Sequence, residues 1–131
     1  MTANGASPDD LSTATLYVVA TVHLDTQWRW TVQDTIREFL PATLKRNFDL
    51  LERYPFFVVS FEGAFRYQLM KEYYPDDFET LRRWVTGGRW SLAGSMLDAP
   101  DVNVVAPESL LRQILYGNRF FERELGRRSR D

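Results

Sequence analysis

An α/β fold built on a parallel sheet is predicted by the order and the composition of the segments. β-type runs alternate with amphipathic helical segments in the order strand, helix, strand, two helices, strand, helix. Of the 131 residues, 44% are hydrophobic and 15% are aromatic, which is enough apolar material for the core of one domain and too much for a disordered chain. We expect right-handed crossovers between parallel strands, in a small doubly wound sheet or in a sector of a (β/α) barrel, which typically needs about 250 residues.

The first strand and the first helix occupy the segment up to Pro55. Residues 16–22 are apolar at nearly every position, which is typical of a strand buried on both faces of a parallel sheet. Helical spacing of apolar residues then runs from Thr31, a capping residue with Asp34 three positions on, to Leu51. Pro41 lies inside this helix and lacks a backbone N–H, which predicts a kink or two helices in sequence.

The second half of the chain repeats the pattern with shorter segments. The spacing predicts a strand at 56–61, a helix at about 64–74, a helix capped by Asp76 or Asp77, a strand at 90–93 and a helix at 107–125. Breaking residues separate these elements, namely Pro75, Gly87 with Gly88, and Gly126. Pro107 suits the first turn of the last helix.

Charge and residue usage exclude several functional classes. A net charge of −2 supplies no basic field for nucleic acid or for an anionic membrane surface. The absence of cysteine excludes disulfide scaffolds and thiolate zinc sites, and it permits a cytoplasmic location. Residues 1–14 resemble a flexible leader and not a signal peptide, and the apolar run at 16–22 is far shorter than the roughly 20 residues that span a bilayer.

The chemistry concentrates at the predicted end of the first strand, where His23 and Asp25 lie two residues apart. On an extended segment this spacing places both side chains on one face, at the sheet edge where α/β proteins bind ligands. An imidazole and a carboxylate suit zinc or another borderline divalent metal at about 2.0–2.2 Å. A hydrogen-bonded pair that steadies the turn explains the same spacing.

Two further groups of residues lie at the same predicted edge. Trp28 and Trp30 are suited either to stacking on the apolar side of a sugar ring or to packing in the core. Asp98, Asp101 and Asn103 follow the third strand, where carboxylates could serve glycosidic acid–base chemistry or, equally well, cap turns and helices.

Several segments in the same order resemble the N-terminal part of the family 38 glycoside hydrolases, the zinc-dependent α-mannosidases. The similarity covers residues 15–131 and is carried by residues 22–30, 31–37, 61–67, 70–75, 88–90 and 107–117. This resemblance implies a (β/α)7-type barrel whose first strand ends in a zinc-binding His-x-Asp motif. His23 and Asp25 occupy the positions of that motif, and Trp28 occupies the position of a tryptophan that stacks on mannose.

The implied activity is hydrolysis of α-mannosidic bonds in mannose-containing oligosaccharides with retention of configuration. Zinc would act as a template and Lewis acid, and Asp101 is a candidate substrate-binding residue. The resemblance places the nucleophilic Asp beyond Asp131, and the last zinc histidine much later. We therefore expect a truncated chain that has no catalytic residue of its own, binds zinc weakly and self-associates.

Two other functions fit the same residues. One is a polysaccharide deacetylase-like hydrolase, which also uses a metal held by His and Asp. The other is a non-catalytic module that has kept the sheet and lost the chemistry.

Overall fold

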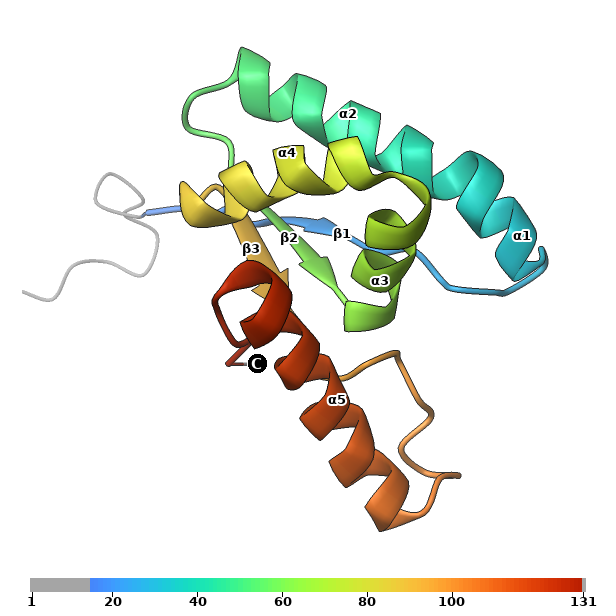
Figure 1. Cartoon of the computed structure of the whole chain (residues 1–131). Coiled ribbons are helices and arrows are strands. Elements are labelled where there is room, and N and C mark those ends of the chain that lie inside the picture. Colours follow the sequence, from blue (N-terminus) through green and yellow to red (C-terminus); the bar gives the residue numbers. More distant parts are fainter. Residues whose placement is uncertain (1–14, 131) are drawn as a thin grey trace, which may run out of the picture.

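The computed structural model describes residues 15–130 and shows a parallel sheet with helices packed against it (Figure 1). The elements are β1 (Ala20–Val22), α1 (Val32–Asp34), the π-helical segment η2 (Thr35–Phe39), α2 (Leu40–Arg53), β2 (Val59–Glu62), α3 (Ala64–Tyr73), α4 (Pro75–Thr86), β3 (Trp90–Ala93) and α5 (Pro107–Leu125). The predicted α/β class with parallel strands is confirmed. The predicted leader, residues 1–14, and Asp131 lie outside the described residues.

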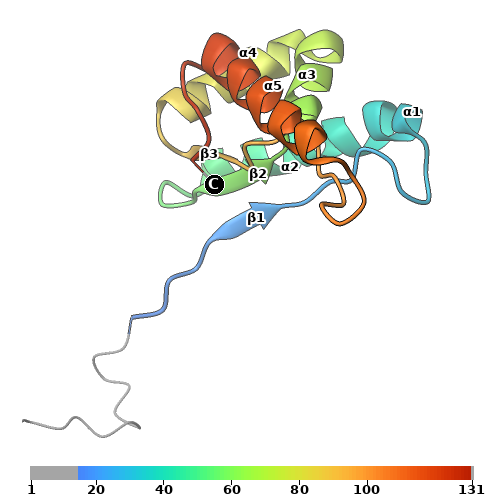
Figure 2. The same cartoon turned by 90° about the horizontal axis from the view of Figure 1, so that it is seen from below.

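The three strands pair in sequence order, β1-β2-β3, and both pairings are parallel. Alternate positions point to opposite faces of the sheet. The register aligns Val22, Phe61 and Leu92 in one row, and Phe61 and Leu92 are buried. The helices α3, α4 and α5 lie together on one side of the sheet (Figure 2). The preceding row consists of Thr21, Ser60 and Ser91, which are exposed or half-buried. One face of the sheet is therefore apolar and covered, and the other is polar and open.

The first strand is shorter than predicted, and the prediction that it is buried on both faces is wrong. Only Ala20–Val22 pair with β2, and the preceding apolar residues are between 73% and 85% exposed. Figure 2 shows this segment running away from the body of the molecule. Apolar composition alone does not predict burial, because a strand is buried only where neighbours cover it, and no other described residue covers residues 16–19.

The helix around Pro41 resolves into successive segments. Thr31 caps α1 through a capping box with Asp34, as the sequence predicted. The π-helical segment follows, in which the Leu40 N–H bonds to Thr35 O five residues back, and α2 begins at Leu40 with Pro41 in its first turn. In this register Ile36 O faces Pro41, which has no N–H to donate. The Tyr74 hydroxyl donates to Ile36 O instead, at 2.5 Å.

Two boundaries in the second half differ from the predicted ones. Phe56 is 84% exposed, and β2 begins only at Val59. Pro75 does not merely end α3, because it is the first residue of α4, with Tyr74 at the N-cap position. Proline is favoured there because the first helical N–H has no partner within the helix.

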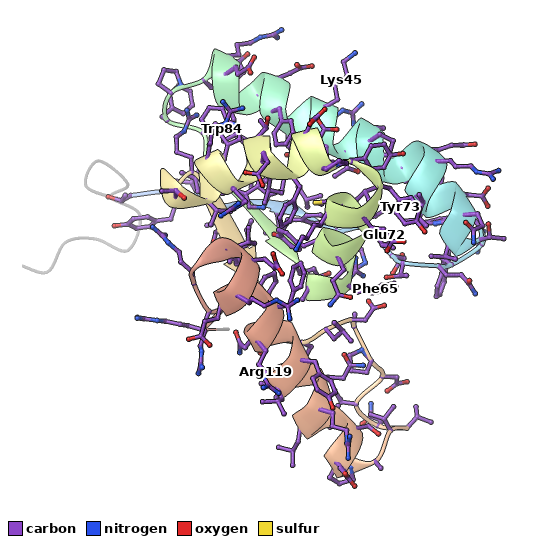
Figure 3. All side chains as sticks on the ribbon, in the orientation of Figure 1. Lys45, Phe65, Glu72, Tyr73, Trp84 and Arg119 are labelled. Atoms are coloured by element: carbon purple, nitrogen blue, oxygen red, sulfur yellow. The ribbon has the colours of Figure 1, made fainter. Side chains whose placement is uncertain are left out.

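The core lies between the covered face of the sheet and the helices. At its centre the Trp90 indole donates to the Tyr67 hydroxyl at 2.9 Å, and that hydroxyl donates to Phe61 O at 2.8 Å. Trp90, Tyr67 and Phe61 are at most 1% exposed. Figure 3 shows the side chains that fill this layer, with Phe65 at the start of α3, where the Phe65 N–H reaches Leu97 O at 2.7 Å.

No helix in residues 15–130 has the length and apolar character needed to cross a membrane.

Candidate functional site

His23 lies at the carboxyl end of β1, between carboxylates from two elements. It directly follows Val22, which is aligned with Phe61, so His23 and Glu62 occupy adjacent positions at the ends of β1 and β2. His23 Nδ1 lies 2.5 Å from Glu62 Oε1, and His23 Nε2 lies 3.4 Å from Asp25 Oδ1. The structure thus brings the two predicted donors together, with Glu62 on the opposite side of the imidazole.

The spacing of this pair fits a shared metal ion. A tetrahedral ion about 2.1 Å from each of two ligand atoms holds them roughly 3.4 Å apart, which is the separation of His23 Nε2 and Asp25 Oδ1. Both side chains are accessible, at 64% and 39% exposed. Across the described part of the chain, no three His, Cys, Asp or Glu side chains form a group that could hold a metal ion. Residues 15–130 therefore supply two donors of a suitable kind, which is fewer than a closed zinc site needs.

A buried arginine lies behind this pair. Arg66, in the first turn of α3, is 1% exposed, and its Nε donates to Leu24 O, the carbonyl between His23 and Asp25. Its Nη1 lies 3.0 Å from Asp98 Oδ1, in an ion pair without the alignment of a hydrogen bond. One guanidinium thus contacts both the segment after β1 and the loop after β3.

Asp98 connects the same loops a second time. Its Oδ2 accepts the Thr26 hydroxyl at 2.9 Å, and its Oδ1 accepts the Ala99 N–H at 2.8 Å. Its own N–H donates to Gln113 Oε1, on α5, at 2.9 Å. A cavity of about 340 Å³ lies beside this carboxylate, and Glu62, Arg66 and Asp98 are among its lining residues.

The two tryptophans after the His-x-Asp motif have different surroundings. Trp28 is 69% exposed, whereas Trp30 is half-buried. The Trp30 indole donates to Thr35 Oγ1 at 2.8 Å, and the centroid of its ring lies 4.8 Å from that of the Phe39 ring. Of the two interpretations offered by the sequence, packing describes Trp30. Trp28 has the accessibility that a sugar platform requires.

Asp101 has contacts of the turn-forming kind. Its Oδ1 accepts the Asn103 N–H at 2.9 Å, and its backbone carbonyl accepts the Val104 N–H at 3.1 Å. This is an Asx turn in an exposed loop. Of the three polar candidates after β3, Asp98 is the one that contacts both the segment after β1, through Thr26, and the first turn of α3, through Arg66.

Sequence reasoning overlooked Arg66, because an arginine within a helical pattern is normally expected on the surface. The available signal was Gly63. It has a φ of +79°, and a Cβ added there would overlap Arg66 Nη1. A glycine between a strand and a helix, three residues before an arginine, therefore marks where the guanidinium passes close to the backbone.

Comparison with known proteins places these features in a family. Residues 13–131 match the profile described as "Glycosyl hydrolases family 38 N-terminal domain". The chain is 32% identical over 113 residues to alpha-mannosidase G of Dictyostelium discoideum, covering 86% of this chain and 10% of that protein. It is 27% identical over 113 residues to alpha-mannosidase 2C1 of Homo sapiens, covering 86% and 11%. It is 26% identical over 116 residues to an alpha-mannosidase of Saccharomyces cerevisiae, covering 88% and 11%.

The chain spans about a tenth of the length of these relatives. Its matched region nevertheless includes every element of the structure, from β1 to α5. The profile match covers far more than half of the chain and contains His23, Asp25 and Trp28. The chain therefore belongs to glycosyl hydrolase family 38, within the N-terminal domain of that family.

Proposed function

We propose that this chain forms the first part of the active site of a zinc-dependent, retaining α-mannosidase that acts on mannose-containing oligosaccharides. The observation that carries the proposal is the pairing of His23 Nε2 with Asp25 Oδ1 at 3.4 Å, at the carboxyl end of β1. Family membership and the mannosidase relatives support the reaction class. We also propose a cytoplasmic location, which the cysteine-free sequence permits.

His23 and Asp25 would hold the metal ion in this proposal, and Trp28 would offer its exposed ring to the substrate. A bound zinc ion supplies a Lewis acid and a fixed point for orienting sugar hydroxyls. The chain's own residues set the position of those groups, because the Arg66 guanidinium holds Leu24 O between the two donors. Asp101 would bind substrate only if its loop moves the carboxylate out of the turn in which it accepts the Asn103 N–H.

We further propose that the described sheet is a sector of a (β/α) barrel. The sequential order of the parallel strands supports this architecture over a doubly wound sheet, in which the order reverses. The polar row Thr21, Ser60 and Ser91 would then face the interior of the barrel. We propose that this chain is inactive alone, because its described residues supply two zinc donors and no assigned nucleophile, and that the remaining groups belong to a longer protein.

The test uses a longer gene product that contains this chain together with the rest of the catalytic domain. We expect wild-type protein to hold zinc and to release mannose from an α-mannoside, and we expect His23→Ala and Asp25→Ala to lose metal and activity together. Metal content by atomic emission and turnover of a chromogenic α-mannoside measure the two properties. Asp49→Ala, a substitution on α2, is the matched control. An active variant that holds no zinc would overturn the assignment of the donors.

A further inference from the structure

We propose that Glu62 is a positioning residue that fixes the tautomer and ring orientation of His23, leaving Nε2 as the nitrogen that binds metal. Glu62 Oε1 lies 2.5 Å from His23 Nδ1. The part of this inference that concerns metal rests on the proposed function. The part that concerns the tautomer depends only on the contact between the two side chains.

The tautomer follows from the chemistry of the two groups. A carboxylate has no hydrogen to donate, so a hydrogen bond at this distance requires the proton to be on His23 Nδ1. In a neutral imidazole the other nitrogen then carries the lone pair. That nitrogen, Nε2, is the one that lies 3.4 Å from Asp25 Oδ1. Glu62 therefore leaves the lone pair on the side of the ring where the second donor is located.

The backbone around Glu62 confines the base of its side chain. Glu62 is the last residue of β2, and the buried Phe61 before it anchors that strand in the core. The loop after β3 passes so close that a Cβ added at Gly94 would lie 3.3 Å from Glu62 Cβ. Gly94 itself has a φ of +64°, a conformation that glycine adopts at no steric cost. Two elements thus set the direction from which the carboxylate approaches the ring.

This arrangement matches a recurring feature of metal-binding histidines. The nitrogen that does not bind the metal usually donates to a carboxylate, a carbonyl or water, and this partner orients the ring and raises its basicity. Loss of such a partner typically weakens metal affinity about 10- to 100-fold. Glu62 is a partner of this kind, because its Oε1 lies 2.5 Å from His23 Nδ1.

The first test is a long-range ¹H–¹⁵N correlation spectrum of the 131-residue chain. His23 is the only histidine, so the spectrum contains a single imidazole. With the imidazole in its neutral form, we expect a protonated Nδ1 in the wild type and in Glu62→Gln, whose amide oxygen still accepts. Glu62→Ala should shift the ring toward Nε2–H, the form that free histidine favours in water. An Nδ1–H tautomer that persists in Glu62→Ala would overturn the proposal.

The second test is a zinc titration of the same proteins, followed through the imidazole ¹⁵N signals. Glu62→Ala should weaken zinc binding about 10- to 100-fold, whereas Glu62→Gln should weaken it less. Glu52→Ala removes an exposed carboxylate from α2 and is the matched control, and far-ultraviolet circular dichroism verifies folding. Loss of zinc binding in Glu62→Gln as complete as that in Asp25→Asn would make Glu62 a ligand and overturn its positioning role. If zinc leaves the wild-type imidazole unchanged, the proposed metal site fails while the tautomer result stands.

Discussion

Arg66 Nη1 lies 3.0 Å from Asp98 Oδ1, and this contact joins the helix after β2 to the loop after β3. The two side chains differ in their access to water, because that of Arg66 is 1% exposed and that of Asp98 is 35% exposed. A charge stranded without its partner is more costly in the interior than at the surface. The pair should therefore respond asymmetrically to the loss of either member.

The first prediction is that Asp98→Asn destabilises the chain more than Arg66→Met does. Asp98→Asn leaves a buried guanidinium without a counter-charge, for which we expect a loss of about 3–5 kcal/mol. Arg66→Met leaves a carboxylate that water and the Thr26 hydroxyl still solvate, so a smaller loss of about 2 kcal/mol is expected. The double variant should lose less than the sum of the two. Urea unfolding of the wild type, the two single variants and the double variant gives the coupling free energy between the two side chains. Losses that add exactly in the double variant would contradict this coupling.

The second prediction concerns Gly63, which has a positive φ and lies against Arg66. Gly63→Ala places an L side chain in an unfavourable conformation and displaces the guanidinium, so we expect a loss of more than about 2 kcal/mol. Gly88→Ala is the matched control, because Gly88 has a similar φ of +75° and no heavy atom within 4 Å of an added Cβ. Thermal melts measure the stability of both variants. Equal losses of stability would show that the close contact with Arg66 adds nothing to the effect of Gly63→Ala.

The strand and helix order could be predicted from the sequence because local spacing determines it. The capping box at Thr31, the stop at Gly126 and the start at Pro107 depend on side chains and backbone conformations a few residues apart. The extent of β1 could not be predicted, since it depends on how far β2 runs beside it. The place of Pro75 could not be predicted, because proline is equally compatible with the end of one helix and the first turn of the next.

The candidate site was predictable only where its residues are close in sequence. His23 and Asp25 lie two positions apart on an extended segment, which is enough to place them together. Glu62 is the last residue of β2 and Asp98 lies in the loop after β3, so their partners depend on how β1, β2 and β3 are aligned. Gly63 is a sequence signal for the close approach of Arg66, but the partner of that arginine, the Leu24 carbonyl, depends on how the segment after β1 lies against α3.

The third prediction is that Trp28 contributes to substrate binding and little to stability. Because Trp28 is 69% exposed, Trp28→Ala should lower the free energy of unfolding by less than about 1 kcal/mol. Trp90→Ala, at a residue 1% exposed, should lose about 3–5 kcal/mol. In a longer gene product that contains this chain, Trp28→Ala should raise KM or lower kcat for an α-mannoside. Unchanged kinetics would refute a role as a sugar platform.

The fourth prediction is an alkaline loss of stability that depends on Tyr67. Burial raises the pKa of the Tyr67 hydroxyl above its ordinary value, and the Trp90 hydrogen bond only partly offsets this effect. Above about pH 10 the unfolded chain loses this proton while the folded chain keeps it. The unfolded state then binds fewer protons, so the free energy of unfolding falls as the pH rises, and this contribution is fully present below about pH 10.

The measurement for Tyr67 is the urea midpoint at several pH values between about 9 and 11. Tyr67→Phe should flatten the alkaline decline. It should also cost about 1–3 kcal/mol at neutral pH, because the Trp90 indole and Phe61 O lose their buried partner. Tyr17→Phe alters an exposed phenol and serves as the control. An identical decline in Tyr67→Phe and in the wild type would contradict the prediction.

The last prediction is that the 131-residue chain self-associates through the first half of α5. This half projects from the body of the molecule (Figure 1) and exposes Leu111, Ile114 and Leu115 by 67%, 38% and 51%. Contiguous apolar surface on a projecting helix favours association between copies. Leu111→Glu with Leu115→Lys replaces this surface by an (i, i+4) ion pair, which supports the helix while removing the apolar contact. We expect the wild type to form concentration-dependent oligomers in light scattering and the double variant to remain monomeric. Arg119→Gln, at a position visible on α5 in Figure 3, should associate like the wild type. A wild-type chain that is monomeric at every concentration would refute the prediction, because the exposed apolar surface of Leu111, Ile114 and Leu115 would then not drive association.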